Sequence, residues 1–279
     1  MHVTVLIPTH DNGPVIGEAI ASVQAQTLSD WELMVVADGA PPETLSVVRA
    51  LAESDRRIRL FEFPKGERHG EASRHLALAE ATGEAVCYLG DDDLWLPDHL
   101  ETMVPMLATH DFAHTRSARM DRYCAVYAKS DRIEKRAVRE RMSVGRYNTT
   151  SPSVVGHRMD AYRRLPEGWA PAPPDVPTDL HMWRKWIAAD VRFTSSERIT
   201  LLKFKHSRRR DRTMEEALTE AAFWRKLFED PAMWEALRQL VPDDDTSLAL
   251  VDVLNHARRA KEPGNGLSGV FARLRRLLD

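Results

Sequence analysis

Short apolar runs alternate with amphipathic stretches along the first third of the chain. The runs are rich in β-favouring residues and predict buried strands at Val3–Ile7, Leu33–Val36, Ile58–Phe63 and Ala85–Leu89. Between the runs, apolar residues recur at helical spacing over residues 15–26, 42–52 and 70–81. This alternation is typical of an α/β fold in which helices join the strands of a mostly parallel sheet.

Three consecutive aspartates, Asp91, Asp92 and Asp93, follow the fourth run. They stand at the carboxyl end of a predicted strand, where open α/β sheets bind their ligands. Neighbouring carboxylates repel one another unless a hard cation or several N–H groups neutralise them. The pattern therefore indicates a divalent metal, Mn2+ or Mg2+, and a solvated acidic turn or helix cap is the alternative interpretation.

The pattern is less regular after residue 110. Charged residues are dense over residues 116–146, which predicts a solvated helix face or a surface excursion. Residues 169–177 contain too many prolines for a helix or an inner strand. Further strands are expected at Ser153–Gly156, Val191–Phe193 and Arg198–Leu202. Further helices are expected at residues 158–164, 214–228, 232–240, 246–260 and 267–278.

Composition narrows the class of protein. With 279 residues and 43% hydrophobic content the chain can bury one large core or two smaller ones. Its net charge of −3 gives no electrostatic reason to expect nucleic-acid binding. Two cysteines, Cys87 and Cys124, make neither a disulfide framework nor a zinc site. No signal peptide and no 18-residue apolar run is found, so we expect a cytoplasmic protein. Residues 267–278 are arginine-rich and apolar, which fits a packing helix or a peripheral helix at the membrane surface.

Four segments resemble the family 2 inverting glycosyltransferases: residues 7–12, 22–27, 31–39 and 90–98. The resemblance implies the GT-A fold, a Rossmann-like mixed and mostly parallel sheet flanked by helices, here with a C-terminal helical extension. It also implies a nucleotide-sugar-binding half over residues 1–110, an acceptor-binding half over 111–207, and the helical extension over 208–279. A dinucleotide fingerprint and a Walker loop are missing, since Gly13 alone follows the first strand.

The resemblance also implies a nucleotide site. Its residues would be Pro8, Thr9, Asp11, Asp38, Arg74, Asp91 and Asp92. Thr9 and Asp11 would line the base and ribose, and Asp38 would accept a hydrogen bond from the base. Seen singly, Thr9 could instead cap a helix, Asp38 could form a turn, and Arg74 could pair with a glutamate on its own helix. One departure is Ala37, where the family usually carries a second acid.

The metal ligands implied by the resemblance are Asp92 and Asp93 of the D-x-D motif, with His206 as a third candidate. Imidazole binds manganese beside carboxylates, and the alternative for His206 is a surface histidine in a basic turn. The arginines at 208–210 and 212 could hold a diphosphate or form part of a solvated basic stretch.

Asp179 corresponds to the aspartate that serves the family as general base. Thr178 is expected to cap the helix whose first turn holds Asp179, and the helix dipole would favour its ionised form. Thr178 replaces an acid of the family pattern, so one carboxylate remains instead of two. An acid with only a structural role at the helix start is the alternative, and His181 is a second candidate base.

These residues imply a metal-dependent inverting glycosyltransferase of the hexosyltransferase type. Its donor would be a nucleoside-diphosphate sugar, with UDP as the first choice of nucleotide, and its acceptor the hydroxyl of a saccharide, a lipid-linked or a small molecule. A catalytically silent nucleotide-sugar or acceptor-binding module of the same fold is the alternative. The oligomeric state does not follow from the sequence.

Overall fold

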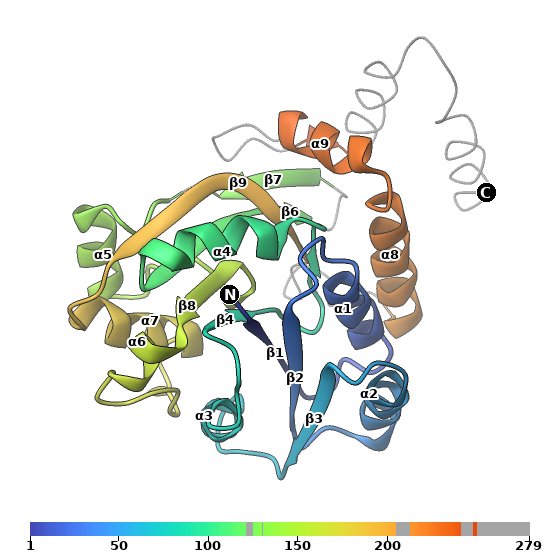
Figure 1. Cartoon of the computed structure of the whole chain (residues 1–279), viewed down its shortest axis with the longest axis horizontal. Helices are drawn as coiled ribbons and strands as arrows, with labels where there is room; N and C mark the ends of the chain where they lie inside the picture. The colour runs from blue at the N-terminus through green and yellow to red at the C-terminus, as the bar shows by residue number, and fades with distance from the viewer. Residues whose placement is uncertain (121–124, 130, 205–212, 241–247, 250–279) are drawn as a thin grey trace.

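The computed structural model describes residues 1–120, 125–129, 131–204, 213–240 and 248–249. Within these residues the strands form one ten-stranded sheet with helices on both faces (Figure 1). The strands are β1 Val3–Thr9, β2 Trp31–Asp38, β3 Ile58–Phe63, β4 Ala85–Tyr88, β5 Leu94–Trp95, β6 Phe112–Met120, β7 Ala125–Lys129, β8 Val155–Arg158, β9 Phe193–Phe204 and β10 Leu248–Ala249. The helices are α1 Val15–Gln24, α2 Pro42–Ser54, α3 Glu71–Leu78, α4 His99–Thr109, α5 Arg136–Ser143, the 3-10 helix η1 Pro152–Val154, α6 Met159–Arg163, α7 Thr178–Ala188, α8 Met214–Leu227 and α9 Pro231–Leu240.

The first four strands are parallel and lie in the order β3-β2-β1-β4. Their connections contain α1, α2 and α3, which confirms the α/β alternation predicted from the apolar runs. Because the strands are parallel, their carboxyl ends meet at one edge of the sheet. The residues after β1, β2 and β4 are thereby brought together.

Antiparallel strands complete the sheet and make it mixed. β8 lies between β4 and β6, and β6 also pairs with β7 and, in parallel, with β9. Two separate strands were predicted where β9 is one continuous strand of 12 residues. Register shifts around Arg116 in the β6–β9 pairing let this long strand stay paired while it bends.

The dense charge over residues 116–146 does not mark a surface segment throughout. Arg116 lies within β6 and is only 4% exposed, with its guanidinium 3.5 Å from Glu197. The expectation of a solvated stretch is therefore wrong for β6, where charged side chains are paired inside the sheet. It holds for α5, whose residues are mostly exposed.

Two apolar layers cover the sheet. Val3, Val5 and Ile7 of β1 pack in a core with α1, α2 and α4, whereas Leu6 faces a second core with α3, α6 and α7. This alternation is the period of two expected of a strand buried on both faces.

The C-terminal helices α8 and α9 pack on the sheet in a third core. Their Trp224 and Leu237 meet Leu202 and Phe204 of β9. The helix expected at residues 246–260 is replaced at Leu248–Ala249 by β10, which pairs with β7, and its remainder and the helix at 267–278 lie outside the described residues. None of the helices in the described segments is both long and apolar enough to cross a membrane.

Candidate active site

A cavity of about 260 Å³ opens at the carboxyl ends of β1, β2 and β4. Six of the residues predicted to bind a nucleotide line it: Pro8, Thr9, Asp11, Asp38, Arg74 and Asp91. They come from separate segments, and the parallel strands bring them to one edge of the sheet. Asp92, the seventh predicted residue, does not line this cavity, which we call the donor cavity.

Arg74, which lines the donor cavity, has a buried Nε atom without a hydrogen-bond partner among the described residues. The Arg74 guanidinium is held by a 2.6 Å hydrogen bond to the His69 carbonyl and lies 4.9 Å over the ring of Trp169. No ion pair joins Arg74 to a glutamate of its helix in the described residues, but the charge of Glu71 on that helix acts on Arg74, so the alternative pairing stays open. An unsatisfied buried polar atom is rare in folded proteins, and the Nε of Arg74 points to a polar ligand.

Asp38 ends β2 and is almost fully buried. Its carboxylate accepts hydrogen bonds from Lys65 Nζ at 2.5 Å and from the Gly66 amide at 2.7 Å. Burial opposes its ionisation, but these two bonds outweigh burial and lower the pKa of Asp38. Asp38 therefore enters the donor cavity as a charged acceptor that is already fixed in position.

Gly70 precedes α3 with a φ of +75°, and a Cβ there would lie 2.8 Å from Asp38 Cβ. An alanine in the left-handed backbone region costs roughly 1–2 kcal/mol. We expect Gly70→Ala to destabilise the protein by more than this, because Asp38 must also shift. Urea unfolding measures this loss. Gly145→Ala is the matched control, since Gly145 has a φ of +65° but open space around a Cβ. Equal losses in the two variants would contradict a contact between position 70 and Asp38.

The acidic turn, Asp91–Asp93, follows β4 after Leu89 and Gly90. Asn12 Nδ2 donates to Asp91 Oδ1 at 2.6 Å, and burial raises the pKa of Asp91. Burial, followed by the charge of Asp93, raises the pKa of Asp92 to about 8. The Asp92 carboxylate accepts no hydrogen bond from another described residue, so of the three acids it is the one least engaged by its neighbours.

Asp93 behaves differently from the expected metal ligand. It is fully buried, and its oxygens accept hydrogen bonds from Ser153 Oγ at 2.5 Å, Lys203 Nζ at 2.7 Å and the Phe204 amide at 3.1 Å. No group of three or more His, Cys, Asp or Glu side chains in the described segments is arranged around a metal position. Ligation of a cation by Asp92 and Asp93 therefore stays a prediction, and His206 lies outside the described residues.

Asp179 lies in the first turn of α7. Its Oδ1 accepts from the Leu180 amide at 2.9 Å and its Oδ2 from Asn148 Nδ2 at 2.8 Å. The residue before α7 is Pro177, so the expected cap by Thr178 is wrong, and Thr178 Oγ1 donates instead to Glu71. Burial raises the pKa of Asp179, although the two hydrogen bonds oppose it. A raised pKa makes this carboxylate a better proton acceptor near neutral pH.

His181, the second candidate base, lies one residue beyond Leu180 on α7. Burial lowers its pKa, and the charged groups that act on it are Lys185, Glu167, Arg184 and Glu71. None of these belongs to the acidic turn or the donor cavity. The surroundings of His181 therefore differ from those of Asp179.

Lys203 connects the acidic turn with Asp179. Burial alone would lower its pKa, but Asp93 and Asp92 outweigh burial and raise it, so the ammonium is charged. Its charge also acts on Asp179. Neither Lys203 nor the positioning residues Asn148 and Lys65 was predicted for the site, because their contacts depend on strand pairing and loop paths that the sequence pattern does not reveal.

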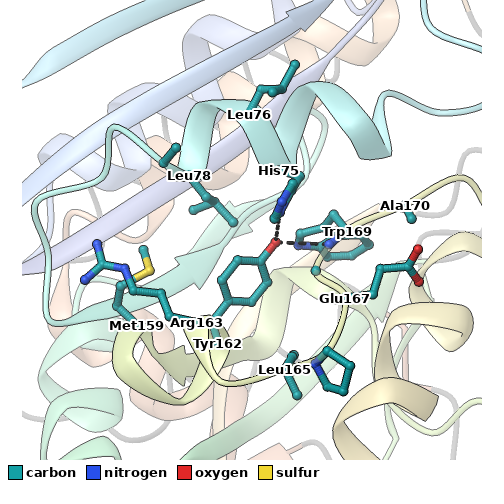
Figure 2. Close-up of a pocket in the computed structure, with 13 residues that line it drawn as sticks. His75, Leu76, Leu78, Met159, Tyr162, Arg163, Leu165, Glu167, Trp169 and Ala170 are labelled. Atoms are coloured by element: carbon teal, nitrogen blue, oxygen red, sulfur yellow. Dashed lines mark hydrogen bonds between the residues drawn. The ribbon is translucent and has the colours of Figure 1, made fainter.

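A larger cavity of about 730 Å³ lies between α3, α6 and residues 165–170 (Figure 2). His75 Nδ1 lies 2.8 Å from the Tyr162 hydroxyl, which also accepts from the Trp169 amide at 3.0 Å. None of the predicted site residues lines this cavity. Its size alone therefore does not make it the centre of the chemistry.

The profile of the family described as "Glycosyl transferase family 2" matches residues 4–164, more than half of the chain. The chain belongs to glycosyl transferase family 2. The matched range includes the donor cavity and the acidic turn. Asp179 and Lys203 of this family 2 chain lie beyond it.

Curated relatives match the family 2 chain over its N-terminal part. The succinoglycan biosynthesis protein ExoW of Rhizobium meliloti is 36% identical over 99 residues, which are 35% of this chain and 31% of ExoW. The UDP-Glc:alpha-D-GlcNAc-diphosphoundecaprenol beta-1,3-glucosyltransferase WfgD of Escherichia coli is 31% identical over 113 residues, 40% of this chain and 43% of WfgD. The chain spans less than half the length of either relative.

Solved structures resemble the family 2 chain over most of its length. S. aureus TarS in complex with UDP-GlcNAc gives a TM-score of 0.56 at 16% identity, covering 92% of this chain and 70% of that one. The mannosyltransferase PcManGT from Pyrobaculum calidifontis, in complex with GDP-Man and Mn2+, gives 0.52 at 20% identity, covering 99% and 80%. The fold is the GT-A fold, as the sequence predicted.

Proposed function

We propose that the protein is a metal-dependent inverting glycosyltransferase that moves a hexose from a nucleoside-diphosphate sugar, UDP-linked in the first instance, to an acceptor hydroxyl. The observation that carries the proposal is the donor cavity, where six residues expected to bind a nucleotide meet beside the acidic turn. The names of relatives and the nucleotide sugars bound to TarS and PcManGT support a donor of this class.

A divalent cation is part of the proposal. Asp92 would hold it, with His206 as a further ligand, and a bound cation would neutralise negative charge on the diphosphate as it leaves. Mn2+ in the PcManGT complex supports this choice of metal. The fit rests on the Asp92 carboxylate, which is half-buried and receives no hydrogen bond from another residue within the described part of the chain.

Asp179 is the proposed general base. It accepts the proton of the acceptor hydroxyl while that oxygen bonds to the anomeric carbon of the donor sugar. The bond from the anomeric carbon to the diphosphate oxygen breaks, and its electron pair leaves with the nucleoside diphosphate. Attack from the face opposite the leaving group inverts the anomeric configuration. Asn148 holds the carboxylate in place through its 2.8 Å hydrogen bond.

A transfer assay tests the proposed function directly. The protein is incubated with Mn2+, a panel of nucleotide sugars, and saccharide and lipid-linked acceptors, and release of the nucleoside diphosphate is followed. We expect release that depends on both donor and acceptor. Nucleotide binding without any transfer in this panel would favour the silent binding module instead.

Asp38→Ala tests the nucleotide end of the cavity. Loss of a buried charged acceptor should weaken nucleotide binding by about 1–3 kcal/mol, measured as the change in Kd for UDP. Asp30→Ala is the matched control, because Asp30 is an exposed acid just before the opposite end of the same strand. Unchanged UDP affinity in Asp38→Ala would contradict a contact between Asp38 and the nucleotide. The role of Asp38 would then be structural, through its hydrogen bonds with Lys65 and Gly66.

A further inference from the structure

Lys203 is the penultimate residue of β9, next to the acidic turn. Its Nζ lies 2.7 Å from Asp93 Oδ2, and 23% of its side chain is exposed. Asp92 and Asp93 both act electrostatically on its ammonium, which in turn acts on Asp179. Lys203 is thus a cation shared by the acidic turn and the candidate base, and its side chain is partly exposed.

Asp93 keeps this lysine in a fixed place. The Asp93 side chain is fully buried, and it is anchored by Ser153 and the Phe204 amide as well as by Lys203. An acid that accepts three hydrogen bonds inside the protein has little capacity left for a metal ion. Its geometry suits a residue that orients the lysine.

The ammonium of Lys203 has hydrogen-bonding capacity to spare. A lysine carries three N–H donors, and the described residues provide one acceptor for them, Asp93 Oδ2. The two remaining donors are available to a ligand. Because Asp93 holds the cation at the acidic turn, whose Asp91 lines the donor cavity, a ligand with anionic oxygens is the chemistry that would use them.

We propose that Lys203 binds the diphosphate of the nucleotide-sugar donor, and that Asp93 positions its ammonium for this contact. The inference rests on the proposed function and deepens it. When the bond between the anomeric carbon and the diphosphate oxygen breaks, negative charge grows on that oxygen, and a fixed ammonium stabilises it without rearranging. Asp92 is then the acid left for a divalent cation, and Asp93 is a positioning residue.

The test compares UDP with uridine by titration calorimetry in EDTA, so that no divalent cation contributes. If UDP does not bind even in the presence of Mn2+, the same comparison is made with GDP and guanosine. Lys203→Met should weaken binding of the nucleoside diphosphate by about 10-fold or more, because charged hydrogen bonds to phosphate are lost. The affinity for the nucleoside should stay unchanged. Lys203→Arg should recover part of the loss, since it restores the charge.

A double variant separates binding from folding. Lys203→Met alone leaves the buried Asp93 carboxylate without its countercharge, which is strongly destabilising. Lys203→Met/Asp93→Asn removes both charges, so it should regain thermal stability but not the affinity for the diphosphate. Recovery of that affinity in the double variant would overturn the proposal, because Lys203 would then serve only to neutralise Asp93.

Lys185→Met is the matched control. Lys185 also forms an ion pair, with Glu167 at 2.7 Å, but away from the acidic turn, so its loss should not change UDP affinity. Equal affinity of the unsubstituted protein for UDP and uridine in EDTA would also overturn the role of Lys203. Failure of UDP and GDP to bind even with Mn2+ would instead reject the proposed function itself, and with it this inference.

Discussion

Asp179→Asn should lower kcat for sugar transfer by about two to four orders of magnitude, the usual contribution of a positioned general base. Asparagine keeps the shape of the side chain and can still accept from the Leu180 amide, but it cannot take a proton at neutral pH. Donor binding should therefore survive. Single-turnover transfer measures the loss, and nucleotide affinity is measured on the same preparation.

Asp160→Asn is the control for this substitution. Asp160 also lies in the first turn of a helix and accepts from the next amide, Ala161, at 2.9 Å. Its substitution should leave kcat unchanged.

The rate of transfer should also depend on pH. In the unsubstituted protein, burial raises the pKa of Asp179, so kcat should fall on acidification at a higher pH than it would with an ordinary aspartate as base. Normal transfer by Asp179→Asn together with loss in His181→Ala would move the base to His181.

UDP should stabilise the protein more in Mn2+ than in EDTA. At a hundredfold excess of ligand over Kd, binding to the folded state raises the free energy of unfolding by about 2.7 kcal/mol. Asp92→Asn should remove the increment that Mn2+ adds, because the carboxylate proposed to hold the cation is gone. Thermal unfolding with and without the metal measures both quantities.

The folding of Asp92→Asn without ligand should be normal, since no hydrogen bond from the described residues to the Asp92 carboxylate is lost. Asp190→Asn, at an exposed position after α7, serves as control and should keep the whole Mn2+ increment. An equal UDP shift in Mn2+ and in EDTA would exclude the metal from donor binding.

The N-terminal half could be predicted from the sequence because its strands are apolar on both faces and its helices carry regular apolar spacing. β1 and β2 are buried over almost every residue, and a strand buried in this way is visible in the sequence as a nearly continuous apolar run. β6 and β9 carry buried or half-buried charged residues such as Arg116 and Lys203. Their polarity hides the strand pattern, and only their pairing in the sheet explains it.

The candidate site was predicted where residues follow the ends of parallel strands, as Thr9, Asp38 and Asp91 do. It was missed where a contact joins distant segments. Lys65 lies 27 residues after Asp38, and Lys203 lies 110 residues after Asp93. No spacing rule connects such pairs, because loop paths and the pairing of β9 with β6 decide which side chains meet.

The insertion of β8 between β4 and β6 has a consequence for recombination among enzymes of this family. Ser153 and Phe204, both beyond residue 110, provide hydrogen bonds to the donor-side Asp93. A chimera joined near residue 110 would therefore exchange the groups that hold the acidic turn along with the residues expected to bind the acceptor. Such a chimera should retain its donor site when the incoming segment supplies equivalents of Ser153 and Lys203. Grafts restricted to the loop over residues 169–177 would leave these supports in place.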